Sequence, residues 1–134
     1  MARRVILDSG VLIAIERGKL DVDEALGTDD AAIAAITAME LLVGVERADE
    51  AHRQTRAVHV EALLSSLPIE NYTVDVARVH ARLAQAMKSG ETRSAHDMMI
   101  AATAAATDRV LLTIDSSAHF EKVAGVRAEI LRAS

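Results

Sequence analysis

Short apolar runs alternate with segments of helical periodicity along the 134 residues of the chain. Apolar runs that end at a polar or turn-forming residue predict strands, here at residues 5–7, 32–36, 69–74, 110–112 and 126–131. Apolar side chains at helical spacing predict helices, here at residues 11–18, 21–26, 51–67, 75–89 and 116–124, with two more that begin at residues 37 and 94. Strands that alternate with helices favour a parallel sheet covered on both faces. We therefore expect residues 1–134 to form one three-layer α/β/α domain with a central, mainly parallel sheet.

The composition excludes several classes of protein. Tyr72 and Phe120 are the only aromatic residues, too few for the exposed rings on which single-stranded nucleic-acid binders stack bases. The absence of cysteine removes thiol catalysis, disulfides and cysteine-ligated metal sites. A formal net charge of −5 argues against a protein that coats nucleic acid nonspecifically, which needs clustered positive charge. A nuclease is not excluded, because the active site of a metal-dependent nuclease is itself acidic.

The start of the chain does not resemble a signal peptide. The basic pair Arg3-Arg4 precedes a short apolar run that ends at Asp8, whereas a signal peptide has a longer apolar stretch. The longest uncharged helical segment, at residues 98–107, is about half the length of a membrane span. We therefore expect a soluble cytoplasmic protein that does not associate with membranes.

Four acidic residues lie where the predicted strands end. Asp8 follows the first strand and Asp115 follows the fourth. Glu40 and Asp97 lie in the first turns of the helices predicted to begin at residues 37 and 94. Ligands of open α/β sheets bind beyond the carboxyl ends of the strands. The four carboxylates are therefore expected to face one edge of the sheet.

A purely structural explanation of these acids has to be weighed. Carboxylates at helix N-termini accept backbone hydrogen bonds and interact favourably with the helix dipole. The spacings at residues 37–40 and 94–97 match or approach a capping box, and Asp8 and Asp115 could cap helices too. Asp75 provides a comparison, because it is an acid at a strand–helix junction to which we assign no chemistry.

The convergence of four carboxylates favours a chemical role. Carboxylates within a few ångströms of one another repel, and without a cation some of them would stay protonated. Mg²⁺ and Mn²⁺ relieve this repulsion and prefer oxygen ligands. Such ions activate water and neutralise a phosphodiester in the transition state. The acids therefore suggest metal-assisted phosphoryl chemistry.

Four blocks of the sequence resemble a known family. They are residues 5–13 (VILDSGVLI), Thr37-x-x-Glu40-Leu41, residues 96–104 (HDMMIAATA) and residues 112–115 (LTID). In order and spacing they resemble PIN-domain ribonucleases, in the form found as VapC toxins of bacterial VapBC toxin–antitoxin systems. The resemblance covers essentially the whole chain. Its most specific part is the third block, in which an acid opens an alanine-rich helix.

The resemblance implies an endoribonuclease that depends on Mg²⁺, with Mn²⁺ as a substitute. Asp8, Glu40, Asp97 and Asp115 would form the acidic metal site, with Asp8 and Asp97 as direct ligands. Asp115 would complete the set directly or through water, and Glu40 would orient or deprotonate the attacking water. The reaction implied is hydrolysis of an RNA phosphodiester that leaves a 5′-phosphate and a 3′-hydroxyl.

The same resemblance has implications for two hydroxyl side chains and one histidine. Ser9 and Thr113 match hydroxyl positions beside the first and fourth acids, where a hydrogen bond would fix the carboxylate geometry. The alternative is that both are turn or cap hydroxyls. The family often has an acid before the phenylalanine that follows the fourth block, whereas this chain has His119 before Phe120. The resemblance therefore implies the four core acids and no further acid at that position.

Basic and histidine side chains give weaker signals. Arg93 and Arg17 are candidate contacts to RNA, because a guanidinium can form bidentate hydrogen bonds to phosphate. The alternative is that they are solvated charges on helices. His96 adjoins the third acid, but adjacent helical residues point in different directions, so we expect no catalytic role for it. His52 and His59 lack the spacing of a zinc site and are expected to be exposed.

The resemblance also implies partners: an RNA substrate such as tRNA, a cognate VapB-like antitoxin, and a second copy of the chain in a homodimer. Two alternatives stay open. A phosphatase or phospho-acceptor domain would use Asp8 as its nucleophile, although such domains need a second acid near the first strand, and Gly10 stands two positions on. A PIN-like binding module with an inert site is the other.

Overall fold

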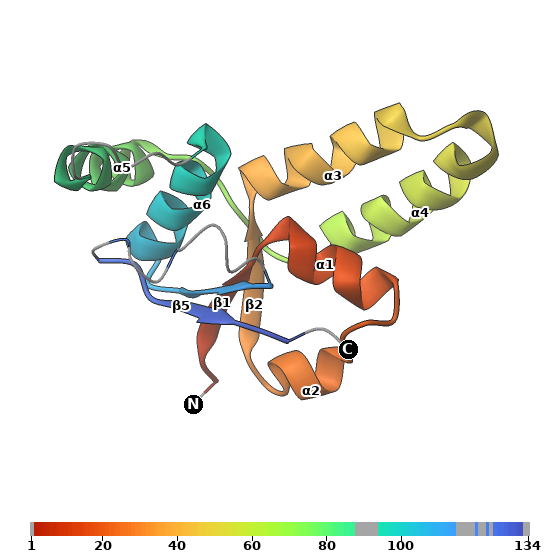
Figure 1. The fold of residues 1–134 in the computed structure, drawn as a ribbon, viewed down its shortest axis with the longest axis horizontal. Helices are drawn as coiled ribbons and strands as arrows, with labels where there is room; N and C mark the ends of the chain where they lie inside the picture. Colours follow the sequence, from red (N-terminus) through yellow and green to blue (C-terminus); the bar gives the residue numbers. More distant parts are fainter. Residues whose placement is uncertain (1, 88–93, 115–119, 121–122, 124, 133–134) are drawn as a thin grey trace.

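The computed structural model describes residues 2–87, 94–114, 120, 123 and 125–132. Its elements follow in chain order (Figure 1): β1 (Arg4–Leu7), α1 (Ser9–Glu16), α2 (Val22–Leu26), β2 (Asp30–Ala34), α3 (Ala35–Arg47), α4 (Glu50–Ser66), β3 (Ile69–Glu70), α5 (Val74–Ala86), α6 (Ala95–Ala106), β4 (Val110–Thr113) and β5 (Ala128–Ile130). The strands form a five-stranded sheet in the order β3-β2-β1-β4-β5, and every pair is parallel.

Strand β1 lies at the centre of this sheet and is buried on both faces. Val5, Ile6 and Leu7 are at most 1 % exposed. Ile6 packs in a cluster with residues of α5 and α6, whereas Val5 and Leu7 pack in a second cluster with residues of α1, α3 and α4. Successive side chains of a strand point to opposite faces, so a continuous apolar run marks a strand covered on both sides. The expected three-layer α/β/α architecture is confirmed.

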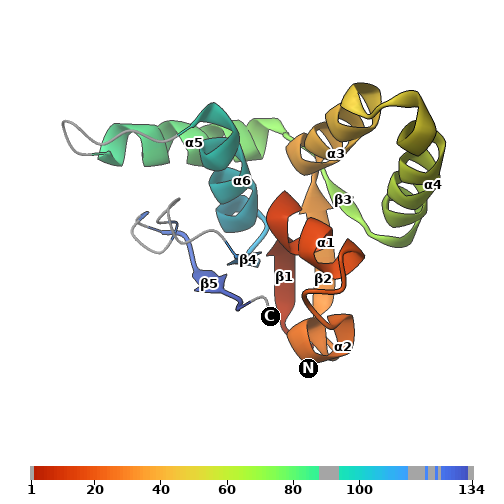
Figure 2. The same cartoon turned by 45° about the vertical axis from the view of Figure 1, so that its right-hand side comes forward.

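The helices divide into two groups around the sheet. Figure 1 shows α5 and α6 on one side and α1, α3 and α4 on the other. Helices α3 and α4 pack against each other and extend away from the sheet as a pair (Figure 2). Arg53 of α4 donates hydrogen bonds to the carbonyls of Glu46 and Ala48, at 3.5 and 3.0 Å, where α3 ends. This guanidinium therefore holds the turn between the two helices.

The second strand lies two residues earlier than the sequence predicted. Strand β2 covers Asp30–Ala34 rather than residues 32–36, and α3 begins at Ala35. Alanine has the highest helix propensity, so an alanine-rich run does not mark where the strand gives way to the helix. The prediction that this helix begins at residue 37 is wrong, and Thr37 is the third residue of α3.

The third strand is shorter than predicted. Strand β3 covers Ile69–Glu70 rather than residues 69–74, because Thr73 is the N-cap of α5 and its hydroxyl accepts from the backbone N–H of Val76 at 3.3 Å. Strand β5 is likewise shorter than the run at 126–131. The helix predicted at 116–124 lies outside the described residues, apart from positions 120 and 123.

A buried arginine joins three strands of the sheet. Arg109 precedes β4 and is 5 % exposed. Its Nη1 donates to the carbonyls of Val5 in β1 and Asp30 in β2, at 3.0 and 2.8 Å. Its Nε donates to Oε2 of Glu70 in β3 at 3.0 Å. Arg109 was not predicted to be structural, although a basic side chain directly before a buried strand is a visible signal in the sequence.

Candidate active site

Asp8 lies at the carboxyl end of β1, where the chain turns into α1. It is the N-cap of that helix, and its Oδ1 accepts from the backbone N–H of Ser9 at 2.8 Å. Its Oδ2 accepts from the hydroxyl of Thr113 at 3.1 Å. Thr113 is the last residue of β4, which pairs directly with β1. Pairing of the two strands therefore brings this hydroxyl to the carboxylate, and both carboxylate oxygens are oriented. Ser9 makes its hydrogen bond to Asp8 through its backbone N–H.

Glu40 lies in the second turn of α3, and its two carboxylate oxygens have different surroundings. Its Oε1 is buried and has no hydrogen-bond partner, whereas its Oε2 lies 3.6 Å from Nδ1 of His96. Burial raises the pKa of Glu40, and the negative charges of Asp8 and, less strongly, Asp97 raise this pKa further against the lowering effect of His96. The charges of Asp8 and Asp97 therefore both act on the Glu40 carboxylate.

Asp97 lies in the first turn of α6, but the cap of that helix is another residue. The hydroxyl of Ser94 accepts from the backbone N–H of Asp97 at 3.0 Å. Asp75 has a similar place in the first turn of α5, behind its cap residue. The two acids differ in their surroundings: Asp75 is exposed, whereas Asp97 is half-buried and its charge affects Glu40.

The structural explanation of the acids therefore holds only in part. Asp8 does cap α1. The spacing from Thr37 to Glu40 is not a capping box, because the N-cap of α3 is Ala34 and Thr37 is buried inside the helix. Glu40 consequently lies one turn deeper than expected. Helix capping does not explain a carboxylate in that position.

Asp8, Glu40 and Asp97 come from three different elements, and the charges of Asp8 and Asp97 both act on the Glu40 carboxylate. Asp115, Arg93 and His119 lie outside the described residues. Within the ranges that the structure describes, no three acidic or imidazole side chains stand close enough together to hold a metal ion as they are placed.

Arg17, the second candidate contact to RNA, is exposed at the opposite end of α1 from Asp8. An eight-residue helix is about 12 Å long. A contact between Arg17 and RNA would therefore lie well away from the acids, and it stays a prediction.

The described donors fit a hard divalent cation in their chemistry. Asp8, Glu40 and Asp97 supply carboxylate oxygens, which Mg²⁺ and Mn²⁺ prefer. A buried polar atom without a partner is costly, and a cation would give the buried Oε1 of Glu40 a favourable interaction. The same charge would offset the repulsion that raises the pKa of Glu40. The N-termini of α1 and α6, which carry partial positive charge, also favour anions at this edge.

Two residues near these acids were not assigned to the site from the sequence. His96 was expected to point away from its neighbour Asp97, but the acid that it approaches is Glu40, on a different helix. Thr37 was interpreted as a cap hydroxyl, and the structure places it in the interior. Its spacing of three residues from Glu40 could have indicated a shared helix face.

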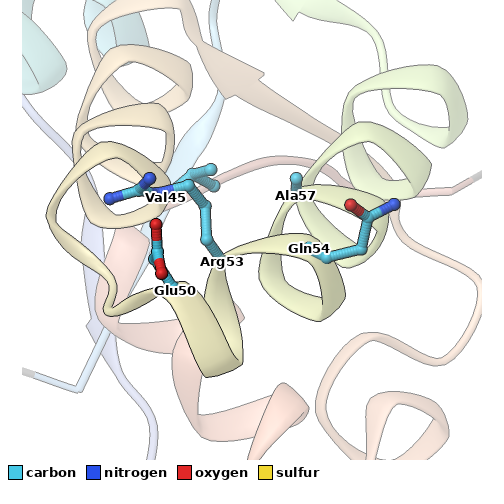
Figure 3. Close-up of a pocket in the computed structure, with 5 residues that line it drawn as sticks. All are labelled: Val45, Glu50, Arg53, Gln54 and Ala57. Carbon is cyan, nitrogen blue, oxygen red and sulfur yellow. The ribbon is translucent and has the colours of Figure 1, made fainter.

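A hollow of about 440 Å³ lies between α3 and α4 (Figure 3). It is lined by Val45, Glu50, Arg53, Gln54 and Ala57. Its part of α3 lies more than one turn beyond Glu40, and Arg53 is bonded to the carbonyls that end α3. We assign this hollow to the packing of the helical pair and give it no catalytic role.

Comparison with known proteins establishes the family. A model of the PIN domain matches residues 5–126. The chain belongs to the PIN domain family. The matched range includes the three acids of the described site and runs from β1 past β4.

The relatives of this PIN domain are VapC proteins. Ribonuclease VapC1 of Rickettsia felis is 30% identical over 135 residues, which cover 97% of this chain and 96% of the relative. Ribonuclease VapC5 of Mycobacterium tuberculosis is 37% identical over 131 residues, which cover 95% and 93%. A crystal structure of VapBC-5 from M. tuberculosis matches with a TM-score of 0.78 at 30% identity and covers 96% of this chain and 98% of that one. The resemblance inferred from the four sequence blocks is confirmed.

Proposed function

We propose that this PIN domain is the ribonuclease toxin of a VapBC-type toxin–antitoxin system, and that it cleaves RNA internally with Mg²⁺ or Mn²⁺. The observation that carries the proposal is the state of Glu40, whose carboxylate oxygen Oε1 is buried and unpaired and whose pKa the charges of Asp8 and Asp97 help to raise. Relatives named as VapC ribonucleases support the activity. The metal dependence rests on the chemistry of the carboxylates.

In this proposal Asp8 and Asp97 would hold the cation directly, and Asp115 and Glu40 would complete the acidic metal site around it. The bound ion supplies activation of water and neutralisation of the phosphodiester. Glu40 would orient the attacking water and accept its proton as the general base. The hydroxyl of Thr113 fixes the direction of the Asp8 carboxylate. The products are a 5′-phosphate and a 3′-hydroxyl.

The proposal includes the partners that the family suggests. Solved relatives are VapBC complexes, which supports a VapB-like antitoxin as a partner of this chain. We further propose a structured RNA such as tRNA as the substrate, with Arg17 and Arg93 as contacts, and a homodimer that acts in the cytoplasm. In the described part of the chain, no helix has the length and apolar character needed to cross a bilayer.

The decisive experiment incubates the purified, antitoxin-free protein with total RNA, with and without Mg²⁺ or Mn²⁺. The variants are Asp8→Asn and Asp97→Asn, with Asp75→Asn as the matched control. We expect cleavage that requires metal, is lost in the first two variants and is kept in the control. Cleavage without metal, or full activity in Asp8→Asn or Asp97→Asn, would contradict the proposal. Absence of cleavage in every arm would favour an inert binding module.

A further inference from the structure

The hydroxyl of Thr37 is buried without a partner. Thr37 is 0% exposed, and its Oγ1 makes no hydrogen bond. A buried hydroxyl that lacks a partner costs stability, whereas an apolar side chain of the same shape does not. Valine has that shape. The fold alone therefore gives no reason for threonine at this position.

Other threonines of the described helices show how such a hydroxyl is normally satisfied. Thr103 of α6 is 2% exposed and donates to the carbonyl of Met99 at 2.7 Å. Thr107, at the end of that helix, donates to the carbonyl of Thr103 at 2.7 Å. Both bonds reach the carbonyl four residues back, which is the usual solution inside a helix.

Thr37 does not have this solution within its helix. It is the third residue of α3, so the residue four positions back is Ile33, in the middle of β2. Ile33 is paired with β3 in the sheet. Because of the boundary between β2 and α3, the carbonyl four residues before Thr37 belongs to the strand and not to the helix.

A second unpaired atom lies one turn further along the same helix. Residues three apart share a helix face, and Glu40 is three residues after Thr37. In the part of the chain that the structure describes, Oγ1 of Thr37 and Oε1 of Glu40 are the two buried side-chain atoms that lack a hydrogen bond. One of these atoms is a donor and the other is an acceptor.

We propose that Thr37 is a positioning residue of the active site, whose hydroxyl donates a hydrogen bond to the Glu40 carboxylate when the acids gather around a bound cation. The inference rests on the metal-dependent function proposed above. An ionised carboxylate accepts stronger hydrogen bonds than a neutral group. Outer partners of this kind hold ligands and bases in their working orientation. The threonine hydroxyl, which is unpaired in the fold, is then retained for the loaded site.

Three variants of the chain test this inference through two measurements that do not depend on activity. Thr37→Val removes the hydroxyl and keeps the shape, Thr37→Ser keeps the hydroxyl, and Thr103→Val removes a hydroxyl that is bonded within its own helix. The first measurement is the melting temperature in EDTA. The second is the affinity for Mn²⁺ by calorimetric titration.

We expect Thr37→Val to melt at or above the wild-type temperature and to bind Mn²⁺ about 10-fold more weakly. Thr37→Ser should bind Mn²⁺ like the wild type. Thr103→Val should melt at a lower temperature and keep its affinity for Mn²⁺. Improved stability together with weakened metal binding is a combination that a merely structural threonine does not produce.

Each opposite result overturns the inference. If Thr37→Val melts at a lower temperature or fails to fold, the hydroxyl serves the fold itself. If this variant binds Mn²⁺ as the wild type does, or if Thr37→Ser binds as weakly as Thr37→Val, the hydroxyl does not position Glu40. These outcomes leave the proposed function standing. If the wild type binds no Mn²⁺, the metal-dependent function fails, and this inference fails with it.

Discussion

The hydroxyl of Thr113 donates to Oδ2 of Asp8 at 3.1 Å, across 105 positions of sequence. The contact exists because β1 and β4 are parallel neighbours that end at the same edge of the sheet. Parallel pairing delivers residues that follow different strands to one place, which is why ligand sites of such sheets form there. The sheet topology thus determines that Asp8, a proposed metal ligand, lies beside Thr113, the residue that orients it.

Loss of this hydrogen bond should weaken metal binding. Thr113→Val removes the donor to Asp8 with little change of shape, and loss of such an orienting partner typically costs about 10-fold in metal affinity. We expect that reduction for Mn²⁺, measured by calorimetric titration, with a matching loss of RNA cleavage. Thr113→Ser keeps the hydroxyl and should restore most of both. Wild-type affinity in Thr113→Val would show that the bond does not orient a ligand.

Asp97 and Asp75 should respond differently to neutralisation, although each lies in the first turn of a helix. Asp75→Asn loses a favourable interaction with the helix dipole, worth about 0.3–1 kcal/mol. Asp97→Asn loses a similar interaction but also relieves repulsion from the nearby carboxylates. We expect urea unfolding in EDTA to show Asp97→Asn at least as stable as the wild type. An equal loss in both variants would mean that Asp97 is an ordinary helix-terminal acid.

The sequence was sufficient to predict the elements whose signal is local. Strands β1 and β4 are continuous apolar runs that end at polar residues, and both lie where they were predicted. The boundary between β2 and α3 was misplaced because alanine occupies both sides of it. The predicted range of strand β3 was too long because Thr73 caps the following helix, and only the packed structure shows which residue serves as that cap.

Part of the site could also be predicted, because the positions of some of its residues have a local signal in the sequence. Asp8 and Asp97 follow from the rule that polar residues gather at the carboxyl ends of parallel strands. The burial of Thr37 and the approach of His96 to Glu40 depend on how α3 and α6 pack together. That packing joins residues far apart in the chain, and no local pattern encodes it.

Glu40 should make the stability of the metal-free protein depend on pH. Its pKa is raised in the folded protein, mainly by burial and the charge of Asp8, so the folded chain binds this proton more tightly than the unfolded chain does. The resulting stabilisation is fully present below the ordinary glutamate pKa of about 4.3. It is lost as the pH rises through the raised pKa.

Glu40→Gln removes this titration and isolates its effect. We expect the variant's advantage in free energy of unfolding over the wild type to increase as the pH rises from about 4 to 8, measured with urea in EDTA. Added Mn²⁺ should reduce or reverse that advantage, because a cation offsets the carboxylate repulsion. An advantage that stays constant across this range would contradict a raised pKa for Glu40.

Arg109 should contribute far more to stability than an exposed arginine. Its guanidinium is buried and bonds to the carbonyls of Val5 and Asp30 and to the carboxylate of Glu70. Arg109→Met leaves these acceptors without their donor, and removal of one partner of a buried ion pair costs about 3–5 kcal/mol. The Glu70 side chain is 26% exposed, so water solvates part of its charge, and we expect about 3 kcal/mol in urea unfolding.

Arg3→Met provides the matched comparison. Arg3 forms ion pairs with Asp29 and Glu129 at 2.8 and 2.6 Å, shorter than the 3.0 Å between Arg109 and Glu70, but its side chain is 40% exposed. Exposed ion pairs contribute about 0–1 kcal/mol because water competes for both charges. A loss below about 1 kcal/mol is therefore expected. Equal losses in the two variants would show that burial with several acceptors does not set the contribution of Arg109.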